Sequence, residues 1–270
     1  MKKLMAVCLT LILILGLCSC DKAPSTPQEV LAASMEKMMN MNSAEFSMDM
    51  TLGMEAEGVA MPMTITGQGE MLMDPQILHM AMDMDMLIIQ MSMEMYTTLE
   101  DENATTYVGV DMGQGMQWVQ QQMEMPKNPA LSTLEALQMI TDLREAPETQ
   151  TVDGVEVIRY DGVITGESVQ KALEGLDVTG ELDEAMGENP FENLYPSLGM
   201  QVTYYIEKES LMIREVTMDM TELMAAMMEV PEMADSGIGF SQVSVSMRYS
   251  GFDTVESIVI PEEALNAPAA

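Results

Sequence analysis

The sequence contains one histidine, His79, and we first consider whether it could serve a catalytic centre. Asp83 and Asp85 lie close enough along the chain to orient an imidazole, but the sequence has no serine in a Gly-x-Ser-x-Gly turn. The glycine-rich loops that bind phosphates are missing too. Carboxylate pairs arise by chance among 44 acidic residues, so none of them indicates a hydrolase site. We therefore expect His79 to be a surface residue of a protein that is not an enzyme and has no cofactor.

The 35 methionines form the second group of side chains with distinctive chemistry. A thioether sulfur is a soft ligand that selects Cu(I), and Met80, Met82, Met84 and Met86 recur at every second position. Copper sites usually include histidine or cysteine as well, and neither is available in this pattern. We therefore predict no metal site, and keep soft-metal binding as an alternative. Methionine is also unbranched and polarizable, which suits a surface that must fit variable apolar partners.

Cys20 is the third residue with its own chemistry. Met1-Lys2-Lys3 precedes an apolar run, Leu4 to Leu17, that is too short to span a bilayer comfortably and is typical of a secretory signal. The run ends in Leu17-Cys18-Ser19-Cys20, which resembles the lipobox that precedes an acylated cysteine in bacterial lipoproteins. Lipidation of Cys20, with palmitate or a similar acyl chain, would anchor the mature protein to the outside of the cell membrane.

Composition limits the partners of the mature chain. Cleavage before Cys20 removes Cys8 and Cys18, so no thiol remains for a disulfide and the core depends on packing. A net charge of −33 repels nucleic acid and anionic lipid head groups. We expect a monomer whose partners are the membrane, through its lipid, and a hydrophobic molecule.

Period-two alternation predicts antiparallel strands after one amphipathic helix. The helix spans about Pro27 to Met41, with Ser25 or Thr26 as its cap. Methionine and other apolar residues then alternate with polar ones in five runs, which lie within 43–55, 61–73, 78–86, 89–95 and 106–118. The parity of the apolar positions changes between the third and fourth runs, and we expect a bulge at 88–90.

The second half of the sequence is less regular. Ser132 to Glu135 resembles a capping box and predicts a helix over 129–146, and a second short helix is expected over 166–176. Residues 177–198 are rich in Gly, Glu, Asn and Pro and predict an exposed loop or lid. Further strands are expected at 155–163, 200–206, 211–220, 239–249 and 254–260. The predicted organisation is a signal peptide (1–19), a lipidated tether (20–28), one domain (29–262) and a flexible tail (263–270).

Two short sequences resemble a known family. They are Ser34-Met35-Glu36-Lys37-Met38 followed by Phe46 to Met50, and the late hairpin Val202 to Leu211, and they are similar to uncharacterised LolA-like lipoproteins of Gram-positive bacteria. The order of the expected elements, an N-terminal helix, a long antiparallel meander, a helical interruption and closing strands, resembles the wider LolA-like superfamily, which includes the LppX/LprG-type lipoproteins. The resemblance implies an α+β fold in which a curved antiparallel sheet, a half-barrel, has helices packed on its concave apolar face. It also implies an apolar cavity for acyl chains.

An apolar face over five long strands exceeds what two or three short helices can cover, so part of it must face a lid, a partner or a ligand. We therefore predict a membrane-anchored lipoprotein that binds a hydrophobic ligand, such as a lipid, with soft-metal binding or a protein interaction without a small ligand as alternatives. The expected cavity-lining residues are Met48, Met50, Leu52, Met61, Met63, Ile65, Met80, Met82, Met84, Met91, Met93 and Trp118.

Overall fold

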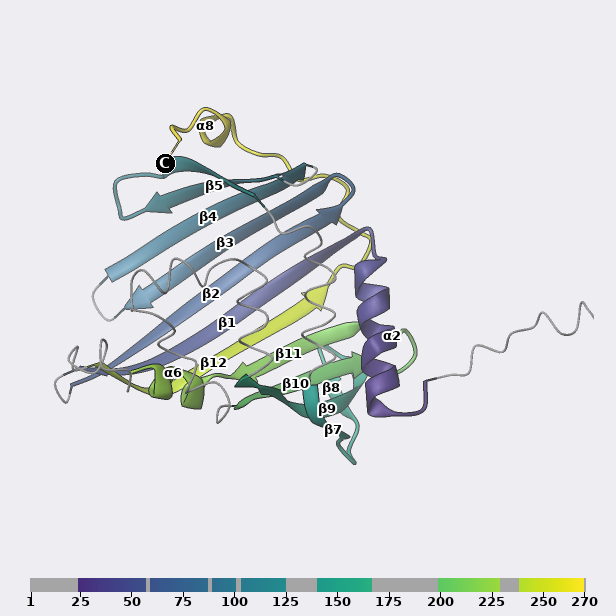
Figure 1. The fold of residues 1–270 in the computed structure, drawn as a ribbon. Helices are drawn as coiled ribbons and strands as arrows, with labels where there is room; N and C mark the ends of the chain where they lie inside the picture. The colour runs from purple at the N-terminus through teal and green to yellow at the C-terminus, as the bar shows by residue number, and fades with distance from the viewer. Residues whose placement is uncertain are drawn as a thin grey trace, which may run out of the picture.

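The computed structural model describes residues 24–56, 59–86, 89–100, 103–124, 140–166, 199–228 and 238–269. Within these residues the backbone forms one open antiparallel sheet of twelve strands and three helices. The strands follow the order β6-β5-β4-β3-β2-β1-β12-β11-β10-β9-β7, with β8 paired to β9 outside this path. Figure 1 shows the sheet as a single twisted layer, with β6 at one edge and β7 at the other.

The first helix, α2, spans Pro27–Met39 and begins with the expected cap. The Thr26 hydroxyl accepts from the backbone N–H of Glu29 at 3.2 Å, and the Glu29 carboxylate accepts from the backbone N–H of Thr26 at 3.1 Å. This reciprocal capping box satisfies two of the free donors at the helix start. Leu31 and Ser34, three residues apart, are its buried side chains, so one side of α2 packs on the sheet.

The first half of the sheet is a meander of six strands that follow one another in the chain. They are β1 (Ser43–Ala56), β2 (Val59–Met73), β3 (Gln76–Met86), β4 (Ile89–Glu100), β5 (Asn103–Asp111) and β6 (Gln117–Glu124). Their side chains alternate between the two faces, and cross-strand partners such as Met50 and Ile65 share a face. The five runs of alternating residues are thus confirmed as strands, and the last run is divided between β5 and β6.

The second half consists of β7 (Ile140–Glu145), β8 (Gln150–Val152), β9 (Val155–Thr165), β10 (Gly199–Glu207), β11 (Ile213–Asp219) and β12 (Ile238–Ser250). A short helix, α6 (Thr221–Met227), follows β11. The two halves join where β1 pairs with β12 along almost its whole length, from Glu45↔Ser250 to Ala56↔Ile238. Residues from the beginning and the end of the domain therefore lie side by side at the centre of the sheet (Figure 1).

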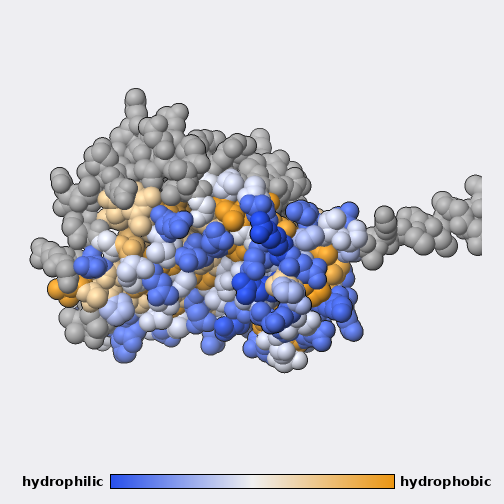
Figure 2. Space-filling view, turned by 90° about the horizontal axis from the view of Figure 1, so that it is seen from below, coloured by the Kyte–Doolittle hydropathy of each residue, from blue (hydrophilic) through white to orange (hydrophobic). Residues whose placement is uncertain are grey.

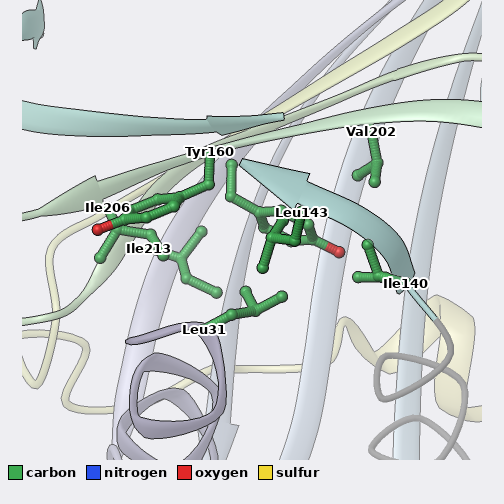
Figure 3. Packing of buried hydrophobic residues seen from close by; sticks show 8 residues of the cluster. Leu31, Ile140, Leu143, Tyr160, Val202, Ile206 and Ile213 are labelled. Carbon is green, nitrogen blue, oxygen red and sulfur yellow. The ribbon is translucent and has the colours of Figure 1, made fainter. Parts of the chain in front are cut away.

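The densest packing lies between α2 and the β7–β11 half of the sheet. The buried residues there are Leu31, Ile140, Leu143, Tyr160, Val202, Tyr204, Ile206 and Ile213. In Figure 3 Leu31 points from α2 toward the strands, and Leu143, Tyr160 and Ile213 lie between the helix and the sheet. Burial raises the pKa of the Tyr204 phenol far above its usual value, as expected for a group without access to water.

Residues 140–145 differ from the prediction of a helix over 129–146. They form β7, an edge strand, whereas residues 129–139, with the expected capping box, lie outside the described residues. Asp142 has φ 54°, and the pairing with β9 shifts register between Thr141 and Arg144. Because of this irregularity Ile140 and Leu143, three residues apart, are both buried. A bulged strand has thus produced the spacing that is typical of a helix.

The junction of β3 and β4 also differs from the prediction, because no bulge occurs in the pairing of these strands. Met86 pairs with Ile89, and the register runs without a shift to Ile77↔Thr98. In this hairpin each even-numbered residue of β3 pairs with an odd-numbered residue of β4. The apolar positions therefore change from even to odd numbers without a bulge.

The C-terminal segment is more ordered than expected. The strand expected at 254–260 does not form, and the expected flexible tail contains α8 (Glu262–Leu265), whose Ala264 is fully buried. The segment begins at Asp253, whose carboxylate accepts from the backbone N–H of Asn42 at 2.6 Å. It then runs past the ends of the meander strands to the opposite edge (Figure 1), where the Gln120 N–H donates to the Pro268 carbonyl at 2.9 Å.

These features confirm the predicted fold class. The protein is an α+β domain built on one open antiparallel sheet, with α2 packed on its apolar face. The second predicted helix (166–176) and the predicted lid (177–198) fall almost wholly outside the described residues.

The core predicts a clear difference between two aliphatic truncations. Ile206 is 1% exposed and Val259 is 77% exposed. Ile206→Ala should lower the free energy of unfolding by about 2–5 kcal/mol, because it removes buried methyl groups and leaves a cavity. Val259→Ala should change it by less than about 0.5 kcal/mol. Urea denaturation followed by circular dichroism would measure both, and equal effects would contradict the assigned core.

Candidate functional site

The apolar side of the meander carries methionine and other apolar side chains across five strands. We call it the methionine face, and its half-buried or buried side chains are Met48, Met50, Leu52, Met54, Met61, Met63, Ile65, Met80, Met82, Met84, Met91, Met93, Met95, Val108 and Val110. Eleven of the twelve predicted cavity-lining residues are among them. The strand alternation therefore brings these eleven together on one side of the sheet.

The pairing of strands arranges these side chains in rows across the sheet. One row runs from Met48 on β1 past Gly67 on β2 to Met82 on β3, Met93 on β4 and Val110 on β5. In the other direction Met48 pairs with Met247 on β12. Met247 pairs with Val216, and Val216 pairs with the buried Tyr204. The methionine face is therefore continuous with the core beneath α2.

Two glycines on β2 shape the middle of this face differently. A Cβ atom at Gly69 would collide with the Phe46 ring, which occupies that space. A Cβ atom at Gly67 would come no closer than 3.4 Å to the Met82 side chain and 3.6 Å to Met48, which are ordinary contacts. Gly67 is buried in the row from Met48 to Met82, and a side chain at this position would contact both methionines.

All ionisable side chains of the described meander strands lie on the other side of the sheet. Asp49, Asp83, Glu94 and Asp111 point away from the methionine face, as the register requires. The Ser92 hydroxyl donates to Asp83 at 2.6 Å, and Arg248 Nη1 lies 3.5 Å from Asp49. The polar groups that the methionine face does contain are neutral, such as the Thr97 and Thr106 hydroxyls, which share a hydrogen bond of 3.1 Å.

The described helices leave the middle of the meander largely uncovered. The helix α2 packs against β7 and β11, α6 against β10 and β12, and α8 against β5 and β6. None of the three packs extensively against β1 to β4. In Figure 2, which views the molecule from the β7 side, hydrophobic residues reach the surface in separate orange patches among hydrophilic ones.

Trp118 is the one predicted cavity-lining residue that the structure places elsewhere. It pairs with Gly109 on β5, and this position faces the polar side of the sheet. There its ring lies 6.0 Å from that of Tyr96, which stacks on His79 at 4.4 Å. The prediction assumed that the even-numbered apolar positions of β5 continue to Trp118. Residues 112–116 form no strand, so the alternation is interrupted before Trp118.

His79 takes a structural position in this aromatic cluster. Its Nε2 lies 3.1 Å from the Glu94 carboxylate, which also accepts from the Tyr96 hydroxyl at 2.7 Å. Burial of the Tyr96 ring, and then its hydrogen bond to the Glu94 carboxylate, raise the pKa of this phenol well above its usual value. His79 was expected to be a surface residue; the register places it on the polar side of the sheet, but its side chain is only 22% exposed.

Two cavities are defined by described residues, and neither is lined by a predicted ligand-binding residue. A cavity of about 490 Å³ opens on the polar side, between Arg248 and His79. A second, of about 390 Å³, lies between the first turn of α2 and the β10–β11 turn, with Val30, Ile206 and Leu211 among its walls. An enclosed cavity over the methionine face therefore stays a prediction.

The remaining predicted sites are mostly outside the described chain. Cys20 precedes its first residue, Pro24. Within the described ranges, no group of three or more His, Cys, Asp or Glu side chains could hold a metal ion. Soft-metal binding by thioethers alone is not tested by this result. None of the helices in these ranges has the length and hydropathy needed to cross a membrane.

The fold and the face define an α+β protein whose single open sheet is apolar on one side and acidic on the other. Its sequence matches the profile of a family of unknown function, DUF6612, over residues 26–269, so the chain belongs to this family. Comparison with the curated proteins finds no match.

Several solved structures have a similar chain trace. The lipoprotein LppX of Mycobacterium tuberculosis is 12% identical with a TM-score of 0.49, over 87% of this chain and 98% of that one. LprF of Mycobacterium bovis is 10% identical with a TM-score of 0.46, over 88% and 97%. A DUF1329 family protein of Desulfovibrio piger is 8% identical with a TM-score of 0.28, over 87% and 95%. At this level of sequence identity the matches are likenesses of the fold.

The same new charge should change the free energy of unfolding by different amounts on the two faces. Met82→Asp places a carboxylate among half-buried apolar side chains and should lower the free energy of unfolding by about 1–3 kcal/mol. Gln68→Asp adds the same charge on the exposed side of the neighbouring strand, opposite Ser47 and Ala81. It should change stability by less than about 0.5 kcal/mol. Thermal unfolding of both variants tests this, and similar losses would show that the assignment of faces is wrong.

Proposed function

We propose that this protein is an extracytoplasmic, lipid-anchored lipoprotein that binds a hydrophobic molecule, such as a lipid, on the methionine face. The observation that carries the proposal is the long apolar face of β1 to β5, whose described side chains are half-buried or buried and not ionisable, and against which the described helices pack little. An apolar surface of this extent is unfavourable in water unless something covers it. A bound hydrophobic ligand would remove it from water.

The choice of methionine supports binding over simple core filling. The core beneath α2 is built from leucine, isoleucine, valine and tyrosine, whereas the face on β1 to β4 is built mainly from methionine. Branched and aromatic side chains have few rotamers and make a rigid core. Methionine has three rotatable bonds and adapts to irregular partners. The sheet thus combines a rigid half with an adaptable half.

Anchoring by Cys20 is consistent with the position of the domain start. Cys20 lies four residues before Pro24, the first described residue, so its lipid can be at most about 14 Å of extended chain from it. A lipid at this position would hold the domain close to the membrane surface, where hydrophobic ligands are found. The acidic surface would keep the domain off anionic head groups while the anchor keeps it nearby.

Lipidation gives the first functional prediction. Cys20→Ala should abolish incorporation of labelled palmitate, and either release the protein from membranes or leave the precursor uncleaved. Cys18→Ala removes a cysteine that belongs to the signal and should leave both properties unchanged. Fractionation of cells expressing each variant would measure this. A Cys20→Ala protein that migrates as mature protein and stays with the membranes would disprove anchoring by this cysteine.

The methionine face gives the second functional prediction. The delipidated domain should bind uncharged acyl probes with an affinity that rises by about 0.8 kcal/mol for each methylene group buried. Gly67→Leu inserts a bulky side chain between Met48 and Met82 on the methionine face and should weaken binding, whereas Ala81→Leu adds the same side chain on the opposite face and should not. Displacement of a fluorescent acyl probe would measure both, and equal affinities would place the ligand elsewhere.

The alternative of Cu(I) binding can be separated from lipid binding by one triple variant. Replacing Met80, Met82 and Met84 with leucine keeps their volume and apolarity but removes three sulfur atoms. Acyl-probe binding should survive this change and thioether-dependent Cu(I) binding should not. Loss of probe binding in the variant, together with tight Cu(I) binding by the parent, would favour the metal.

A further inference from the structure

The meander is built from a stretch of sequence without lysine or arginine. Lys37 in α2 is followed by no other lysine or arginine until Lys127, and β1 to β6 lie wholly between them. The one residue of these strands that can become a cation is His79, which is on the polar face and contacts Glu94. A ligand lying on the methionine face therefore meets no positive charge from the strands beneath it.

The arginines of the described chain are already paired with carboxylates. Arg248 lies 3.3 Å from Glu215 and 3.5 Å from Asp49, on the polar side of the sheet. Arg214 contacts Glu207 at 2.6 Å, and Arg159 contacts Asp161 at 2.8 Å. The fourth, Arg144, is within 3.8 Å of Asp142 at the far edge strand β7. An anionic ligand would have to compete with these carboxylates for any of the four arginines.

The two described lysines are also poorly placed for this role. Lys37 is exposed in the last turn of α2, which packs on the other half of the sheet. Lys208 is exposed in the turn between β10 and β11, between Glu207 and Glu209. Neither side chain belongs to the rows of β1 to β5 that form the methionine face.

The acidic residues of the meander make an anion still less favourable. Asp49, Asp83 and Glu94 lie directly behind the face, one residue away along each strand from Met48, Met82 and Met93. Their charges act through the thickness of a single sheet, where the dielectric constant is lower than in water. An unpaired anionic head group on the methionine face would be both desolvated and repelled.

The polar groups on this side can nevertheless bind a neutral head group. Thr97 and Thr106 lie at one end of the methionine face, half-buried and hydrogen-bonded to each other. A hydroxyl can donate one hydrogen bond and accept others, so this pair has unused capacity for an alcohol or an ester carbonyl.

From these observations we infer that the ligand of the methionine face is an uncharged lipid, with hydroxyl or ester groups as its only polar part, and that lipids with anionic head groups are excluded. This inference rests on the proposed function and narrows its ligand class. Charge complementarity carries it: the described strands of this face present no cation and are backed by carboxylates, so the face accepts neutral chains and rejects anions.

The test compares two probes that share an acyl chain and differ in charge. Binding of 1-oleoylglycerol and of oleate to the delipidated mature domain is measured at pH 8 and constant ionic strength, below the concentrations at which either forms micelles. The neutral probe should bind at least about tenfold more tightly than the anion. Equal or tighter binding of oleate would overturn the inference while leaving the proposed function intact. Absence of binding by both probes would overturn the proposed function.

A pair of lysine variants shows whether charge on this face causes the difference. Thr97→Lys places a cation on the methionine face, and Thr98→Lys places the same cation on the opposite side of the same strand. Oleate binding should rise several-fold in Thr97→Lys and stay unchanged in Thr98→Lys. Equal responses would mean that net charge, and not this face, controls selectivity.

Folding of each variant is checked by circular dichroism before the titration. The second pair, Thr106→Lys and Thr105→Lys on β5, repeats the comparison if Thr97→Lys does not fold. The same outcomes apply to it: a rise in oleate binding confined to Thr106→Lys supports the inference, and equal responses contradict it.

Discussion

The register of β1 is the constraint on which the rest of the structure depends. This strand pairs with β2 on one side and with β12 on the other, so it joins the meander to the half of the sheet that carries the core. In both pairings Met48, Met50 and Leu52 face the same side as the apolar residues of their neighbours. A slip of one residue in either pairing would turn these side chains toward water and the carboxylates toward the core. The alternation of methionine with acid therefore specifies both the fold and the chemistry of each face.

Two devices stabilise this central pairing at the end where α2 enters the sheet. The Asp253 carboxylate accepts from Asn42, and the Ser43 hydroxyl accepts from the backbone N–H of Val255 at 3.1 Å. The backbone hydrogen bond to Asn42 lowers the pKa of Asp253, so this contact is at full strength at neutral pH. Ser43 is 1% exposed, so its hydrogen bond to Val255 is shielded from water. This bond fixes the C-terminal segment to the start of β1 before the segment crosses toward β6. The register of β1 and the path of the chain's end are thus set by the same few residues.

The sequence was most informative where a single period persists. The strands β1 to β5 and the capping box of α2 could be predicted, because alternation and capping are local properties of the chain. The prediction was wrong where an irregularity altered the spacing, as at β7, whose positive φ at Asp142 gives buried positions a helical spacing. Trp118 was placed on the wrong face for a related reason, since residues 112–116 reset the alternation. Alternation reports which residues share a face only within one uninterrupted strand.

The C-terminal segment shows a different limit. Its apolar residues Val255, Ile258 and Ile260 resemble a strand, but they cross the ends of the meander and pair with none of its strands. Nothing local in that segment indicates that its end would reach β6, because the contact of Gln120 with Pro268 joins residues far apart in the chain. Such long-range contacts depend on the arrangement of the whole sheet and not on the local strand propensity of the segment.

The acidic composition and the methionine content are two parts of one physical solution. A protein with an adaptable apolar face needs a strong net charge to remain soluble and separate from its own copies. A positive net charge from lysines would have attracted the domain to the anionic surface of the membrane. It would also have placed cations near the methionine face, where they could pair with anionic ligands. Carboxylates on the opposite side of the same strands provide solubility without either effect, because Asp83 and Glu94 alternate with the methionines they accompany. The same residues that give the domain its negative charge would therefore also set the charge that a ligand on the methionine face experiences.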